Sequence, residues 1–219
     1  MIWDWQFAEE IMPQILRGLG VTLQAVVGGA VIAVLLGLLW AIMRRSRRRL
    51  IAWPAAAGVE AIRSTPLLVQ IYFLFYVMPE IGLTLDPMIA GILALGIHYS
   101  CYASEVYRSG IDAVSKGQWE ASTALGLSSG QCYRYVILPQ AIPPIIPALG
   151  NYIIAMLKDA PLLSAITVLG ILQRAKIIGN ETFRYIEPLT IVGAIFLLLS
   201  LISSCFIRLL ERRLKVTHA

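Results

Sequence analysis

The chain has 219 residues, of which 58% are hydrophobic and 14% are charged. Soluble domains carry about a quarter of charged residues, so this composition excludes an ordinary soluble protein and predicts one all-α integral membrane domain over residues 1–219. The formal charge is +5, but the basic residues cluster beside apolar segments. That pattern is typical of membrane topology and argues against a nucleic-acid partner.

Several kinds of chemistry have no motif in this sequence. The three cysteines, Cys101, Cys132 and Cys205, are odd in number and lack metal-ligand spacing, so they indicate neither a disulfide framework nor a metal site. There is no G-x-x-x-x-G-K-[ST] loop to hold ATP phosphates. We therefore expect this chain to bind no cofactor, and any ATP-driven step to belong to a partner subunit.

The first segments predict an interfacial helix followed by a membrane span. Apolar residues recur every four positions in residues 1–16, which favours an amphipathic helix at a membrane surface; a frayed tail is the alternative. Residues 21–43 contain no charge and are long enough, at about 34 Å, to cross the hydrocarbon core. Five arginines follow within residues 44–49, which predicts a cytoplasmic end for this span and an external N-terminus.

A second span is expected at 51–78, interrupted by Glu60, Arg63 and Pro66. Proline removes a helical hydrogen bond, so the Thr65–Pro66 step predicts a break. Such a break is tolerated in a membrane only where protein or water covers the backbone. A proline-kinked helix with no further role is the alternative.

The third expected span, 88–106, becomes polar toward its inner end, where His98, Tyr102 and Glu105 lie. A single histidine in a span is more often a hydrogen-bonded packing residue than a ligand. Glu105 is costly in contact with lipid, so we expect it to pair with a basic group or to lie at the inner interface.

Residues 115–139 form a polar loop in this apolar chain. Its pattern predicts two short helices joined by a left-handed turn at Gly126, and Ser128 with Gln131 forms a capping box at the second helix. Pro139 is expected to close the loop. An ordinary helical hairpin is the alternative interpretation.

A fourth span is expected at 145–169, and it contains Lys158 and Asp159. On the insertion scale each charge near a span centre costs about 2.5–3.5 kcal/mol, which pairing, solvation or a ligand must recover. Neighbouring helical residues point about 100° apart, so the two cannot face one path equally. This pair is the strongest site prediction within the membrane.

The rest of the chain predicts an outer segment at 170–187 and a fifth span at 188–210. On this five-span model 13 of the 18 Lys and Arg residues lie on the inner side, so the model obeys the positive-inside rule and places the C-terminus in the cytoplasm. The inner residues at this end are Arg208, Arg212, Arg213 and Lys215.

The polar loop resembles the cytoplasmic EAA loop (E-A-A, three residues, G, nine residues, I-x-L-P) of ABC importer permeases. The match comprises Glu120, Ala121, Gly126, Val136, Leu138 and Pro139. Ser122 replaces the second alanine and Val136 the isoleucine. The resemblance implies that this loop contacts an ATPase subunit, through the residues Glu120, Ala121, Ser122, Gly126, Leu127 and Pro139.

Three further stretches resemble permeases of the polar amino acid uptake branch. They are residues 63–70 (RSTPLLVQ), residues 102–111 (YASEVYRSGI) and the L-G-N…L-K-D run that ends at Asp159. Ala160 and Pro161 stand where threonine and serine are common, which puts any hydroxyl contribution in question. The resemblance and the polar spans together predict a substrate path formed by Thr65, Gln70, His98, Tyr102, Glu105, Asn151, Lys158 and Asp159.

The resemblance implies a bacterial cytoplasmic-membrane importer subunit for a polar amino acid. It further implies a second membrane subunit, two ATPase subunits and an extracytoplasmic solute-binding protein. Few polar groups of both signs beside many aromatics favour a zwitterion, so an ectoine-like solute is the second choice. Two other classes stay open: an exporter or scaffold subunit, and an intramembrane hydrolase using His98 with Ser100 or Ser203, although Ser100 points away from His98 on a helix.

Overall fold

The computed structural model describes residues 3–214, and every regular element in that range is helical. Lys215, which the positive-inside count includes, lies outside the described residues. The elements are α1 (Trp5–Arg44), α2 (Arg49–Arg63), α3 (Leu67–Tyr72), the π-helix η1 (Phe73–Val77), the 3-10 helix η2 (Met78–Ile81), α4 (Pro87–Asp112), α5 (Lys116–Ala124), α6 (Ser129–Cys132), the π-helix η3 (Tyr133–Ile137), α7 (Leu138–Asp159), the 3-10 helix η4 (Ala160–Ile166), α8 (Ile171–Thr182) and α9 (Ile186–Arg213).

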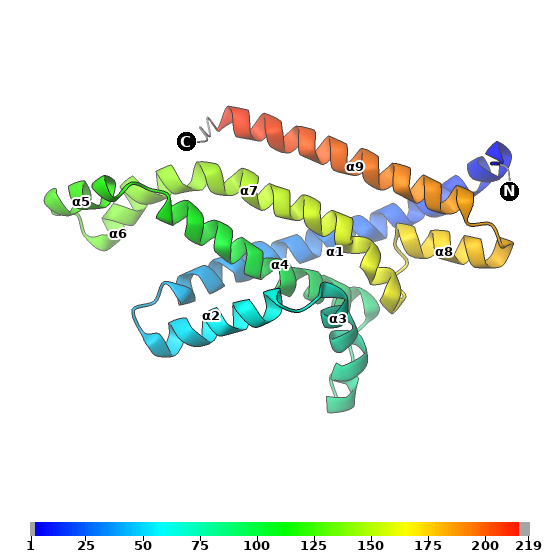
Figure 1. Cartoon of the computed structure of the whole chain (residues 1–219), viewed down its shortest axis with the longest axis horizontal. Helices are drawn as coiled ribbons and strands as arrows, with labels where there is room; N and C mark the ends of the chain where they lie inside the picture. The colour runs from blue at the N-terminus through cyan, green and yellow to red at the C-terminus, as the bar shows by residue number, and fades with distance from the viewer. Residues whose placement is uncertain (1–2, 215–219) are drawn as a thin grey trace.

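Long helices α1, α4, α7 and α9 run beside one another along the length of the molecule (Figure 1). Helices α5 and α6 lie at one end, whereas α8 lies at the other end next to the start of α1. Helix α3 and its continuation leave the bundle sideways. Helix α4 contacts α1, α7, α2 and α3, so it is the central element against which the others pack.

Helix α1 is continuous from Trp5 to Arg44, so the expected boundary between an interfacial helix and the first span is absent. The reason is tertiary: the repeat that includes Ile11 and Ile15 is buried against α8 and α9 instead of being left for a membrane surface. Gly18 continues this contact, since a Cβ there would lie 2.7 Å from the backbone of Gly170. Pro13 is accommodated inside the helix.

Helices α1 and α4 pack closely because small residues face each other along their length. A Cβ on Gly37 would lie 2.6 Å from the Cβ of Ala103, and one on Gly96 would lie 2.6 Å from the side chain of Ile32. Small residues at such contacts let helix backbones approach within the membrane. This seam fixes the position of the polar inner half of α4.

Three segments of the described chain are long and apolar enough to cross a membrane: α1, the run from Ser129 to Ile166, and α9. A fourth exists if the bent pair α2 and α3–η2 counts as one crossing. Helix α4, which contains the expected span 88–106, is not among them. Because α4 is surrounded by other helices, it needs no continuous apolar surface.

The second and fourth expected spans differ from straight helices at 51–78 and 145–169. A bend of 103° separates α2 from the α3–η2 segment, since the backbone at Pro66 is extended. The fourth expected span begins earlier than residue 145, because α6 continues through η3 into α7. Pro143, Pro144 and Pro147 lie inside α7. The π-helix η3 directly precedes the proline-rich turns; such bulges shift the hydrogen-bond register.

Candidate functional site

The break between α2 and α3 is held by side chains that replace the lost helical hydrogen bonds. The Thr65 hydroxyl donates to the backbone oxygen of Ile62 at 3.0 Å, and Gln70 Nε2 donates to the same oxygen at 2.7 Å. Gln70 Nε2 also lies 2.7 Å from Thr65 Oγ1. These contacts satisfy the backbone acceptors that a proline break leaves open.

Gln70 also joins this break to the central helix α4. Its Oε1 lies 3.2 Å from Nδ1 of the buried His98. An amide oxygen is only an acceptor, so this contact requires the proton on Nδ1 and leaves Nε2 as the acceptor of neutral His98. Three predicted path residues, Thr65, Gln70 and His98, are therefore brought together.

Asp159 contacts α4 at Tyr99, the residue that follows His98. The Tyr99 hydroxyl donates to Asp159 Oδ2 at 2.8 Å, whereas Lys158 is exposed and points elsewhere. The two charged side chains thus face different directions, as their helical spacing predicts. They lie at the end of α7, where it becomes η4, and not within an unbroken helix.

Aromatic rings line the contact between α4 and α7. The Tyr102 ring lies 5.3 Å from His98, 6.0 Å from Tyr99 and 5.4 Å from Tyr152 between ring centroids. The Arg63 guanidinium lies 5.3 Å from the Tyr102 centroid, a distance at which a cation and a ring face attract. Asn151, which precedes Tyr152 in the chain, is exposed, and its side chain makes no hydrogen bond within residues 3–214.

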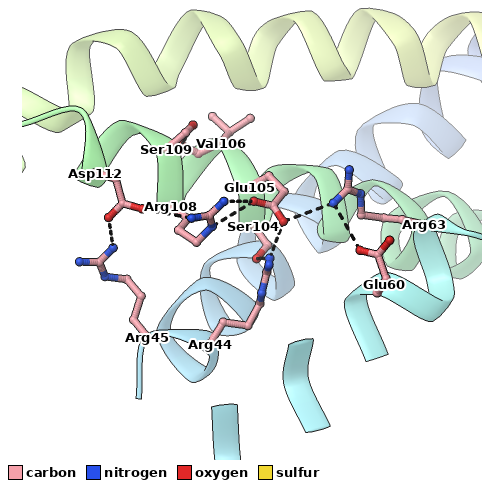
Figure 2. A network of polar contacts seen from close by, with 10 residues as sticks. All are labelled: Arg44, Arg45, Glu60, Arg63, Ser104, Glu105, Val106, Arg108, Ser109 and Asp112. Atoms are coloured by element: carbon pink, nitrogen blue, oxygen red, sulfur yellow. Dashed lines mark hydrogen bonds and ion pairs between the residues drawn. The ribbon is translucent and has the colours of Figure 1, made fainter. Parts of the chain in front are cut away.

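Glu105 lies at the centre of an ionic network formed by three helices (Figure 2). Its carboxylate lies 2.8 Å from Arg44 of α1, 3.3 Å from Arg63 of α2 and 3.0 Å from Arg108 of α4. The expectation that Glu105 pairs with a basic group is confirmed. Sequence reasoning missed Arg44 and Arg63 as partners, although each is a basic residue at the edge of an apolar run.

The network continues to the end of α4. Arg108 lies 3.2 Å from Asp112, and Arg45 lies 2.5 Å from the other oxygen of that carboxylate. Figure 2 shows the chain of contacts from Arg45 to Glu60 along one side of α4. These ion pairs tie the ends of α1 and α2 to α4.

The loop at residues 115–139 has the local structure that its sequence predicts. Helix α5 ends at a left-handed Gly126 with φ of 71°, and Ser128 with Gln131 forms the expected capping box at α6. Glu120 and Ala121 are exposed, and Leu127 is partly buried. Helices α5 and α6 and the turn between them project from the end of the bundle (Figure 1).

Two details of this loop differ from expectation. Ser122, one of the residues that the resemblance implies contact an ATPase subunit, is buried and faces inward, and its hydroxyl donates to the backbone oxygen of Gln118 at 2.7 Å. Pro139 does not close the loop, because the helix continues from α6 through η3 into α7 and Pro139 lies in the first turn of α7.

A second charged cluster, at the opposite end of the molecule, was not foreseen. Arg184 pairs with Asp4 at 3.2 Å and with the buried Glu187, and its guanidinium lies 4.2 Å from the Phe7 ring centroid. The Phe7 backbone N–H and Arg184 lower the pKa of Asp4, and Arg184 lowers the pKa of Glu187. This cluster fastens the start of α1 to the start of α9.

The described helices, with polar residues gathered between α3, α4 and α7 and a two-helix loop projecting from one end, form an all-helical membrane protein. The chain belongs to the family of binding-protein-dependent transport system inner membrane components, whose model matches residues 33–216. It is thus a transport subunit with several membrane helices.

The relatives and solved structures agree with this family. The chain is 49% identical to the probable amino-acid ABC transporter permease protein y4tG of Sinorhizobium fredii over 94% of this chain and 89% of that protein. It is 36% identical to the arginine transport system permease protein ArtQ of Bacillus subtilis over 93% of this chain and 94% of that protein.

Among solved structures, an amino acid ABC transporter with histidines shares 39% identity and a TM-score of 0.94, covering 97% of this chain and 100% of that chain. An inward-facing MetNI methionine ABC transporter shares 20% identity and a TM-score of 0.68 over 92% of this chain and 98% of that chain. The second similarity establishes the fold alone.

Proposed function

We propose that the chain is the permease subunit of an ATP-binding-cassette importer that moves a polar amino acid across a bacterial cytoplasmic membrane. The observation that carries this proposal is similarity over nearly the whole chain to proteins named as amino-acid permeases. Neither the ectoine-like solute nor the hydrolase is favoured by these relatives. The chain itself performs no catalysis in this proposal, and a partner subunit hydrolyses ATP.

The proposed topology has five crossings, an external N-terminus and a cytoplasmic C-terminus. It is supported by the arginines that follow α1 and by the common direction of α1 and α9, whose starts are joined by Arg184. The bent α2 to η2 segment is one crossing, and α4 is the central one. A cysteine at Glu9 should then react with an impermeant thiol reagent outside intact cells, whereas one at Ser46 should not.

The projecting loop is the proposed contact with the ATPase subunit. Its support is that Glu120 and Ala121 are exposed on α5, and that Gly126 and the capping box fix the turn from α5 into α6. In this proposal two ATPase subunits and a second membrane subunit complete the complex, and an extracytoplasmic binding protein delivers the solute. Closure of the ATPase pair then moves α5 and α6, and through η3 it moves α7.

The proposed solute path runs past the polar contacts between α3, α4 and α7. Asp159 offers a negative charge, Arg63 a positive one, and the Tyr102 and Tyr152 rings lie between α4 and α7. Opposite charges and ring faces suit the two ends of an amino acid. Lys158 and Asn151 are exposed and would face a neighbouring subunit or the path.

Co-purification tests this proposal. The chain should bind a separate ATPase subunit, and a binding protein loaded with an amino acid should raise ATP hydrolysis by the purified complex. An Asp159→Asn variant should assemble normally but lose that stimulation, whereas the exposed Lys176→Gln of α8 should retain it. A complex whose ATPase ignores the loaded binding protein would refute an importer role.

A further inference from the structure

A chamber of about 560 Å³ lies between α1, α4, α7 and η3. Three helix faces and one residue of η3 surround it. Its lining comprises Leu38, Ala41, Ile42, Arg45, Tyr107, Ile111, Tyr133, Leu138, Ile142 and Ile145.

The chamber follows from the sequence spacing of its walls. Leu38, Ala41, Ile42 and Arg45 lie three or four positions apart, so they form one face of α1, and the residues from α7 have the same spacing. Nearly all the lining atoms are apolar. Water is not stabilised in an apolar chamber, whereas an unfilled one forfeits packing contacts, so this site suits an apolar occupant.

Positive charge is concentrated at one end of the chamber. Arg45 contacts Asp112 through Nη1 and also lies beside the Tyr133 side chain; a guanidinium has five N–H groups, so donors remain for a further acceptor. The network in Figure 2 contains four arginines against three carboxylates, Glu60, Glu105 and Asp112. The three arginines at 47–49 follow directly, are exposed and form no ion pair within the described residues.

We propose that this chamber binds one acyl chain of an anionic phospholipid, with the lipid phosphate at Arg45. This inference rests on the proposed topology, which places the C-terminal end of α1 at the cytoplasmic membrane surface. The apolar walls fit the chain and the excess of arginine fits the headgroup, as basic pockets between membrane helices do. A zwitterionic lipid matches the walls equally well but gains less from the charge.

The proposed lipid contacts the segment that carries the projecting loop. Tyr133 lines the chamber and follows α6 directly, and its ring lies 5.3 Å from the Trp119 ring of α5 in an edge-on arrangement. Because α1 forms the opposite wall of the chamber, an acyl chain in it packs against both α1 and Tyr133. The lipid therefore fills the space between the first long helix and the base of the α5–α6 loop.

The test measures lipid binding to the purified complete importer by native mass spectrometry, with dioleoyl phosphatidylglycerol against dioleoyl phosphatidylcholine. Wild type should bind the anionic lipid preferentially. Arg45→Gln should weaken that binding about five-fold, the change that corresponds to the roughly 1 kcal/mol a basic residue contributes near anionic lipid. Asp112 keeps its contact with Arg108 in this variant.

Matched variants separate the chamber from general effects. Ile142→Trp fills the chamber and should abolish the bound lipid, whereas Ile146→Trp, on the same helix but outside the lining, should not. Arg47→Gln removes a nearby charge and should have less effect than Arg45→Gln. Inorganic phosphate at millimolar concentration should not displace the lipid, because it lacks the acyl chain.

Several results would overturn the lipid site. They are equal binding of the two lipids to wild type, unchanged binding in Ile142→Trp, displacement by phosphate alone, or cross-linking of a cysteine at Ile142 to another subunit. The measurement is independent of transport: a complex without binding-protein-stimulated ATPase that still retains the lipid contradicts the proposed function and leaves the lipid site standing.

Discussion

Gly126 allows the geometry of the projecting loop to be tested apart from its contacts. Its φ is 71°, and a Cβ added there would meet no atom within 4 Å. A substitution therefore creates no clash within this chain, and its cost is conformational, about 1–2 kcal/mol for an L-residue in the left-handed region. Valine, which is β-branched, should have a conformational cost at the upper end of this range, whereas asparagine tolerates the left-handed conformation.

A cost of that size lowers the population of the native turn about 5- to 30-fold. In purified complexes Gly126→Val should reduce ATPase-subunit retention and stimulated ATP hydrolysis, and Gly126→Asn should retain most of both. Gly130→Ala is the control, because Gly130 also has open space but lies in α6 without a positive φ. Wild-type behaviour of Gly126→Val would show that the left-handed turn is not needed for coupling.

Two further predictions concern the ionic clusters. Glu105→Gln should lower the unfolding free energy by about 2 kcal/mol, because a side chain that is only 24% exposed loses its ion pairs with three arginines. The control is Glu60→Gln, at a side chain that is 72% exposed, which should change the unfolding free energy by less than about 0.5 kcal/mol. Equal midpoints of the two variants in thermal unfolding would contradict this prediction. At the opposite end of the molecule, Arg184 lowers the pKa of both Asp4 and Glu187. The stabilisation of the fold by these ion pairs is therefore present at neutral pH and is lost as pH falls below about 4. Arg184→Gln should therefore lower the unfolding temperature at pH 7 and much less at pH 3, and an equal loss at both would refute the linkage.

The parts of the site that depend on neighbours in the sequence could be predicted. The turn at Gly126, the capping box at Ser128 and the break at Pro66 each follow from the chemistry of a few adjacent residues. Their outcome in the fold is local as well: a left-handed glycine, two short helices and a change of direction. Helices α5 and α6 and the turn between them could therefore be assigned to a projecting loop without a structure, whereas the continuation of α6 through η3 into α7 could not.

The parts that depend on distant residues could not be predicted. Nothing local indicates that Arg44 and Arg63 converge on Glu105, or that Arg184 meets Asp4 across 180 positions. The 103° size of the bend after α2 is likewise set by packing against α4 and η4. The prediction of a separate interfacial helix at residues 1–16 was wrong for the same reason. The apolar face at the start of α1 packs against α8 and α9, and its sequence pattern does not distinguish that contact from a membrane surface.

The central claim is that this permease imports a polar amino acid, and competition of uptake tests it most directly. The chain is reconstituted with its ATPase, its second membrane subunit and its binding protein, and ATP-dependent uptake of a labelled amino acid is measured. Unlabelled glutamine, arginine, histidine or cystine should compete for that uptake, and ectoine should not. Uptake that none of these amino acids inhibits, but that a sugar or an oligopeptide does, would contradict the account.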